Sequence, residues 1–170
     1  MPTVKTKKFI LRPPRMSDAA SIAKYIGDIR VSRNLSSVPY PYALKDAKQW
    51  LRKKLKSTSD ETLSLLIEIE KEAVGCISLE RISKGHKAEM GYWLGRQHWG
   101  KGIMTEAVKA MTKLGFKKYK LRRIQAHVYH FNKASARVLE KNGFKLEGLL
   151  RKAVAKDKKI LDAYIFAKIK

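Results

Sequence analysis

The chain has 170 residues, with 38 Lys and Arg against 15 Asp and Glu, which gives a formal net charge of +23 at neutral pH. This length fits one domain, and a hydrophobic share of 44% beside 31% charged residues indicates a globular core and excludes a disordered polycation. No apolar run approaches the roughly 20 residues that span a bilayer, the first residues lack an apolar signal core, and Cys76 has no second cysteine to pair with. We therefore expect a single domain over residues 1–170, located in the reducing cytoplasm and without a membrane partner.

The first half of the chain predicts a strand, two helices and three further strands. Pro13-Pro14 ends the first strand, because proline cannot donate to a sheet. Ser17-Asp18 is typical of a helix N-terminus, and residues 30–43, rich in Asn, Ser and Pro, are predicted as a loop. The predicted elements are strands over 8–12, 62–70, 73–81 and 88–94, helices over 17–27 and 44–56, and a tight turn at Lys71-Glu72.

The second half predicts an alternation of helices and strands. A turn-rich segment over 95–102 precedes a long amphipathic helix, in which apolar residues recur at helical spacing at Ile103, Ala107, Ala110, Met111 and Leu114. The remaining predicted elements are a strand over 123–129, a helix over 133–142, and strands over 144–150 and 160–169. This order predicts an α+β fold with a mixed, mostly antiparallel sheet of six or seven strands and about four helices, rather than a doubly wound sheet.

The segment over 95–102 has the chemistry of an anion site. Unpaired N–H groups converge at a helix N-terminus, where the helix dipole also favours a phosphate. Gly100 and Gly102 would let the backbone approach the anion closely. A plain strand-to-helix connection is the simpler alternative. A nucleotide P-loop is excluded because Gly102 stands where that motif requires Ser or Thr, and the Gly-x-Gly-x-x-Gly dinucleotide motif is absent.

Two ordered motifs resemble signatures of the GNAT N-acetyltransferase superfamily. Gln-His-Trp-Gly-Lys-Gly at 97–102 is similar to its coenzyme A pyrophosphate loop, (Gln/Arg)-x-x-Gly-x-(Gly/Ala). Asn-Lys-Ala-Ser-Ala-Arg-Val-Leu-Glu-Lys-Asn-Gly-Phe at 132–144 resembles its second signature. Leu-Arg-Pro at 11–13, Gly-Tyr-Trp-Leu at 91–94 and Gly-Phe-Lys-Leu-Glu-Gly at 143–148 are similar to the RimJ/RimL branch, the ribosomal-protein N-terminal acetyltransferases.

The resemblance implies acetyl-CoA as acetyl donor, a primary amine as acceptor and no metal. The pantetheine arm would lie between the strands over 88–94 and 123–129, and an interior glycine such as Gly91 is compatible with close approach of a ligand. Asn132 could be a plain helix N-cap, a role that is compatible with contacting the cofactor, and Lys133 and Arg137 could belong to a solvated helix face. The cofactor-binding residues that the resemblance implies are Trp93, Leu94, Arg96, Gln97, His98, Trp99, Gly100, Lys101, Gly102, Ile103, Met104, Thr105, Asn132, Lys133, Ser135 and Arg137.

The reaction needs a base for the acceptor amine and a proton donor near the sulfur. Glu89 lies on the strand where other superfamily members carry a catalytic carboxylate, although a cross-strand salt bridge explains it equally well. Leu139 stands where many members have a tyrosine acid, a departure that favours Ser135 as a hydrogen-bond donor to the sulfur. Ser135 could also be a helix-face hydroxyl bound to its own backbone. His127 and His130, three residues apart on a strand, are not expected to share a metal.

The resemblance and the charge together favour the N-terminal α-amine of a protein as acceptor, with ribosomal proteins as candidates. A polyamine acceptor is an alternative from the same branch, but a strongly basic protein repels a polycation unless acids line the site. A nucleic-acid-binding module without enzymatic activity is the alternative from another class. It would use the basic clusters over 52–56, 117–123 and 151–159, although charge runs are usually solvated. We expect a monomer or a homodimer.

Overall fold

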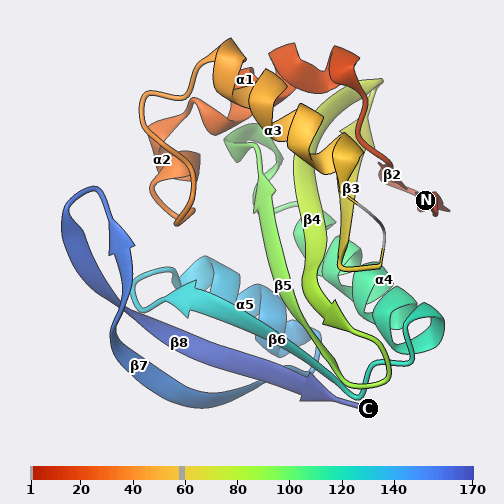
Figure 1. Ribbon diagram of the computed structural model, residues 1–170, viewed down its shortest axis with the longest axis vertical. Helices are drawn as coiled ribbons and strands as arrows, with labels where there is room; N and C mark the ends of the chain where they lie inside the picture. The colour runs from red at the N-terminus through yellow and green to blue at the C-terminus, as the bar shows by residue number, and fades with distance from the viewer. Residues whose placement is uncertain (1, 58–59) are drawn as a thin grey trace.

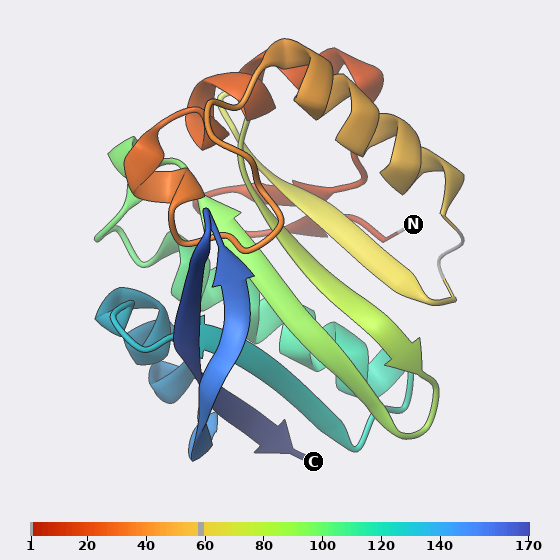
Figure 2. The same cartoon turned by 60° about the vertical axis from the view of Figure 1, so that its left-hand side comes forward.

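The computed structural model describes residues 2–57 and 60–170. It consists of one sheet with helices on both faces (Figure 1 and Figure 2). The strand order is β1-β2-β3-β4-β5-β6-β8-β7, and neighbours are antiparallel except β5 with β6. The strands are β1 (Val4–Lys5), β2 (Ile10–Arg12), β3 (Thr62–Ile69), β4 (Glu72–Ser83), β5 (Lys87–Leu94), β6 (Arg123–Tyr129), β7 (Lys145–Lys156) and β8 (Lys159–Ile169). The α-helices are α1 (Ala19–Ile26), α2 (Ile29–Ser32), α3 (Leu44–Lys56), α4 (Ile103–Lys118) and α5 (Lys133–Lys141), and 3₁₀ turns cover Met16–Asp18 and Arg96–His98.

The predicted α+β class with a mixed, mostly antiparallel sheet is confirmed, with two additional short elements. Strand β1 pairs with β2 and makes eight strands among the described residues. Helix α2 falls partly within 30–43, where the loop prediction is wrong, because Asp28 caps the helix by accepting a bond from the Arg30 amide. Both elements are too short for periodicity to reveal. None of the helices in the described part of the chain is long and apolar enough to cross a membrane.

Helices bury both faces of the sheet (Figure 2). On one face, α4 packs its buried side chains, among them Ala107 and Met111, into a cluster with Met90 of β5 and Ile124 of β6. On the other face, α1 and α3 form a second buried cluster against β3 and β4. The strand residues alternate between the two clusters, as the period of two in a sheet requires. The sheet therefore holds two helical layers at fixed positions on either side.

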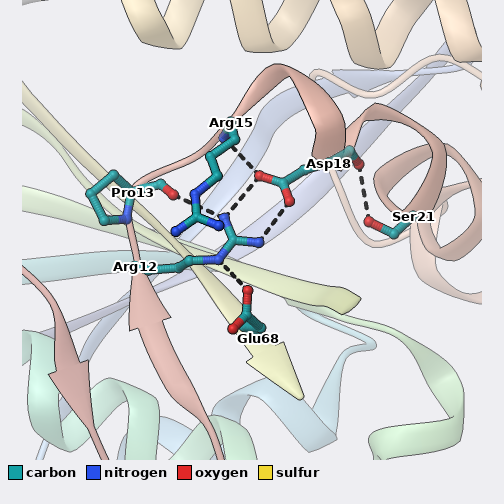
Figure 3. Close-up of polar contacts among 6 residues, drawn as sticks. All are labelled: Arg12, Pro13, Arg15, Asp18, Ser21 and Glu68. Carbon is teal, nitrogen blue, oxygen red and sulfur yellow. Dashed lines mark hydrogen bonds and ion pairs between the residues drawn. The ribbon is translucent and has the colours of Figure 1, made fainter. Parts of the chain in front are cut away.

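Arg12 fixes the connection from β2 to α1 (Figure 3). Its side chain is only 6% exposed and donates to both carboxylate oxygens of Asp18, at 2.9 and 2.7 Å, and to Glu68 of β3. Asp18 also accepts the Arg15 backbone amide at 2.7 Å. The hydrogen bond to Asp18 is the main cause that raises the pKa of Arg12. A buried, bidentate ion pair of this kind requires its full set of partners, because either charge alone would be costly to bury.

The sheet opens between β5 and β6. These strands pair in parallel only over Lys87–Glu89 and Arg123–Gln125. Beyond those pairs they separate, and Figure 1 shows β5 and β6 diverging from their shared lower end. Past this point, the backbone groups of β5 and β6 that face each other have no partner strand among the described residues. The divergence therefore creates an opening through the middle of the sheet, as predicted for the strands over 88–94 and 123–129.

Candidate active site

A cleft of about 950 Å³ occupies the opening between β5 and β6 and extends to both faces of the sheet. The N-terminal turn of α4 and the first turns of α5 form one end of the cleft. Strand β4, helix α3, the segment over 33–38 and the β7–β8 hairpin form the other end. The hairpin also contacts that segment directly, because the Lys156 ammonium donates to the Val38 carbonyl. The cleft thus connects the glycine-containing turn with the opposite face of the sheet.

The predicted anion site is built from free backbone amides. Gly100 and Gly102 have φ values of 73° and 75°, in the left-handed region that favours glycine, and Gly102 is the N-cap of α4. None of the amides of residues 100–105 donates to another group among the described residues. Both glycines line the cleft, and nothing lies within 4 Å of the position of a Cβ at Gly100. The amides are therefore available to an anion at the positive end of a long helix.

A cation that sequence reasoning missed lies beside this turn. The Lys8 ammonium donates to the Lys101 carbonyl at 3.0 Å and lies 3.6 Å from the Cβ position of Gly102. On the α5 side of the same cleft, Lys133, Arg137 and Lys141 add positive charge at helical spacing. The end of the cleft near α4 and α5 is consequently cationic. Nothing local in the sequence links Lys8 to residue 101, since 93 residues separate them.

The structure brings most of the predicted site residues to the cleft. Those that line it are Glu89, Trp93, Leu94, His98, Trp99, Gly100, Gly102, Ile103, Met104, Thr105, Asn132, Lys133, Ser135 and Arg137. Arg96, Gln97 and Lys101 are not among the lining residues. Arg96 instead lies 3.3 Å from the Asp28 carboxylate at the start of α2. The Trp99 indole donates to the Leu94 carbonyl at 2.7 Å, which holds the turn between β5 and α4 closed.

Ser135 faces Tyr92 across the cleft. Asn132 caps α5 by accepting the Ser135 amide at 3.1 Å, so the N-cap interpretation of Asn132 is confirmed. This cap places the Ser135 hydroxyl 2.8 Å from the Tyr92 hydroxyl of β5. Burial raises the pKa of Tyr92 to about 12, so its proton stays in place at neutral pH. Leu139, at the position of the missing tyrosine, is fully buried in the core. Ser135 and Tyr92 thus place two hydroxyl groups in contact with each other in the cleft.

Glu89 lies at the apex of the opening, where two groups bind its carboxylate. Arg81 forms an ion pair with one oxygen, and Nδ1 of His127 lies 3.1 Å from the other. Glu80 is the direct cross-strand partner of Glu89 and binds the Lys54 ammonium at 2.9 Å. The salt-bridge interpretation of Glu89 is therefore confirmed, and the carboxylate also lines the cleft. His127 was missed as a site residue, although strand alternation places it on the same face as Gln125, the register partner of Glu89.

Two further groups show how the cleft affects titration. Burial, with a contribution from Lys101, lowers the pKa of the His98 imidazole, which keeps it neutral near pH 7. Burial raises the pKa of the Cys76 thiol to about 12, as expected for an inert core cysteine. The cleft environment therefore favours the uncharged form of both groups.

Comparison with known proteins gives a consistent set of relatives. The family model described as an acetyltransferase (GNAT) domain matches residues 8–145. A Bacillus licheniformis protein named uncharacterized N-acetyltransferase p20 is 30% identical over 173 residues, covering 100% of this chain and 97% of that protein. The ribosomal-protein-serine acetyltransferase of Escherichia coli is 37% identical over 101 residues, covering 59% of this chain and 56% of that protein.

The fold is likewise similar to solved structures. Mycobacterium smegmatis RimJ, solved in complex with CoA-disulfide, has a TM-score of 0.87 and 24% sequence identity to this chain. The match covers 99% of this chain and 87% of that one.

Proposed function

The chain belongs to the GNAT acetyltransferases and is an N-acetyltransferase, and we propose that it acetylates the N-terminal α-amine of a protein with acetyl-CoA as donor. Ribosomal proteins are the first candidates, because the Escherichia coli relative is named for that substrate class. The observation that carries the proposal is the cleft itself. It joins free helix-terminal amides at one end to a carboxylate at the other.

The cationic end of the cleft fits a diphosphate. The amides over 100–105 would hold its oxygens, and Lys133 and Arg137 would face the remaining phosphate charge. When bound, acetyl-CoA supplies the thioester whose acetyl group is transferred. The diverging strands leave backbone groups of β5 free to bond an extended arm between them. These features support placing those predicted cofactor-binding residues that line the cleft around one ligand.

The other end of the cleft fits the acceptor amine. An α-amine titrates near 7.7–8.0 and must lose a proton before it attacks, so a basic group at this end accelerates the reaction. We assign proton removal to the Glu89 end and donation toward the sulfur to the hydroxyl of Ser135, which Tyr92 supports. A free thiolate is a fair leaving group, so the hydroxyl needs only to stabilise it.

The charge balance at the acceptor end favours a monovalent amine over a polyamine. Glu80 and Glu89 are the acidic residues among those lining the cleft in the described part of the chain. Lys54 and Arg81 compensate them by ion pairs. The described lining of the cleft therefore has no surplus negative charge that would attract a polycation such as spermidine. The net charge of +23 of the whole chain repels such a molecule.

A panel of acceptors tests the proposal. The purified protein is incubated with acetyl-CoA and either peptides that begin with Ser or Ala, the same peptides blocked at the N-terminus and carrying an internal lysine, or spermidine. We expect release of CoA thiol with the free N-termini, and mass spectrometry should place one acetyl group on the α-amine. Preference for spermidine or for the lysine side chain would refute the acceptor assignment. A complete lack of thiol release together with a lack of acetyl-CoA binding would refute the proposed cofactor site.

A further inference from the structure

His127 and Glu89 form a pair at the point where the sheet opens. Glu89 is the last residue of β5 that pairs with β6, and its register partner is Gln125. His127 lies two residues further along β6, on the same face and just inside the opening. Nδ1 of His127 is 3.1 Å from Oε1 of Glu89, and both side chains line the cleft. Their side chains are 32% and 22% exposed, so both can be reached by a ligand in the cleft.

Neither oxygen of Glu89 is free. Oε2 binds the Arg81 guanidinium, which reaches it through an irregularity of β4 in which Arg81 has a φ of 51°. Such bulges redirect side chains near active sites. Oε1 is taken by His127. An amine arriving in the cleft therefore meets a carboxylate whose two oxygens already have partners.

Nε2, the second ring nitrogen of His127, is the remaining atom of this pair that could accept a proton from the amine. Oε2 of Glu89 is paired with the Arg81 guanidinium, and a carboxylate oxygen only accepts hydrogen bonds, so the hydrogen in the contact between Glu89 and His127 lies on Nδ1. Nε2 then has a lone pair, and it has no hydrogen-bond partner among the residues that the structure describes. An acidic side chain that fixes a histidine tautomer while the opposite nitrogen accepts a proton is a recurring arrangement in catalysis.

We propose that His127 is the catalytic residue that takes the proton from the acceptor ammonium, and that Glu89 is a positioning residue that fixes its tautomer. This rests on the proposed function and specifies which atom performs proton removal. The ammonium gives one proton to Nε2 of His127, and its nitrogen uses the freed electron pair to bond the acetyl carbon. The carbon–sulfur bond breaks, the second nitrogen proton ends on the sulfur, and His127 returns its proton to water.

Kinetics with chemical rescue test the catalytic half of the proposal. His127→Ala should lower kcat about a hundredfold at neutral pH, and imidazole added to the buffer should restore a large part of it. Acetyl-CoA affinity, measured by calorimetry, should stay unchanged. Glu89→Gln should lower kcat about tenfold, and the double variant should be no slower than His127→Ala, because the two residues act as a unit. His130→Ala is the matched control, since His130 is absent from the residues lining the cleft, and it should retain activity.

Nitrogen NMR tests the positioning half without requiring turnover. The chain has four histidines, so ¹⁵N-labelled imidazoles can be assigned by substitution. His127 should be in the Nδ1–H form in the wild-type protein and should lose this fixed tautomer in Glu89→Leu. An Nε2–H form in the wild type overturns the proposal. The proposal is also overturned if His127→Ala keeps the wild-type kcat. It is overturned as well if kcat falls in this variant and added imidazole restores none of it. A wild type that acetylates none of the acceptors refutes the proposed function instead, and the NMR result then decides the pair separately.

Discussion

The Tyr92 hydroxyl lies 2.8 Å from the Ser135 hydroxyl and thereby connects β5 to α5 across the cleft. The contact depends on the N-cap of α5, because the Asn132 side chain fixes the first turn that carries Ser135. Two hydroxyl groups in contact can relay a hydrogen bond to a third atom, since each is both a donor and an acceptor. Both residues line the cleft, which supports the assignment of this pair to the sulfur.

Removing the Ser135 hydroxyl should therefore slow the reaction without releasing the cofactor. Ser135→Ala is expected to lower kcat about tenfold, in the range of one lost hydrogen bond to a charged group. Tyr92→Phe should have a smaller effect, because Ser135 can still reach the sulfur directly. Steady-state kinetics beside acetyl-CoA calorimetry separate the two contributions. A Ser135→Ala variant with unchanged kcat would exclude the hydroxyl from the chemical step.

The glycine turn offers a matched pair of substitutions. Gly100 and Gly85 both have positive φ, 73° and 75°, and both have open space around the Cβ position. An alanine at either position costs about 1–2 kcal/mol of backbone strain. Only Gly100 lines the cleft. We expect Gly100→Ala and Gly85→Ala to unfold at similar temperatures, while only Gly100→Ala weakens acetyl-CoA binding in calorimetry. Equal affinities in both variants would exclude the amides over 100–105 as the diphosphate site.

Cys76 should report unfolding through its reactivity. Burial raises the pKa of its thiol to about 12 in the folded protein, from an ordinary value of 9.0. The folded thiol therefore keeps its proton at pH 8–9, and the fold loses stability from this group as pH rises from about 9 toward 12. Iodoacetamide at pH 8 should label Cys76 only after denaturant is added, as seen by mass spectrometry. Labelling at equal rates with and without denaturant would contradict the buried position.

The Arg12 cluster should be a major contribution to stability. Arg12→Met leaves the carboxylates of Asp18 and Glu68 without their common partner, and breaking a buried pair in this way costs about 3–5 kcal/mol. For a chain of this length the loss corresponds to a Tm lowered by roughly 6–20 °C in calorimetry. Arg12→Lys should recover only part of this, because lysine cannot form the bidentate contact. Arg52→Met on the exposed face of α3 serves as the control and should change Tm little.

Local signals in the sequence were sufficient to predict most of the helices and strands. Helix α3 begins at Leu44 and ends at Lys56 as predicted, and β6 spans Arg123–Tyr129 as predicted. In each of these elements, apolar residues recur with the period of a helix or a strand over enough positions to predict the element. Strand β7 continues to Lys156, six residues past its predicted end at Leu150, because pairing with β8 extends it across two register shifts. Pairing between strands is a tertiary effect that no local window contains.

The same distinction between local signals and tertiary effects applies to the residues of the candidate site. The left-handed conformations of Gly100 and Gly102 and the N-cap at Asn132 depend on neighbouring residues and were accessible to sequence reasoning. The contact between His127 and Glu89 depends on the register of two strands that are 38 residues apart at the contact. Arg96 lies outside the cleft lining and contacts Asp28, which caps a separate helix. Residues that belong to motifs were found, and partners brought in by the fold were not.

The short parallel seam between β5 and β6 has a mechanical consequence. The sheet consists of two antiparallel halves, β1-β2-β3-β4-β5 and β6-β8-β7. Among the described residues, the three residue pairs between β5 and β6 are the only strand pairing that joins them. A molecule held by the amides of α4 on one half and by the first turn of α5 on the other would act as a brace between them. Donor binding would therefore slow amide exchange in both halves together, and it would stabilise the whole domain by mass action.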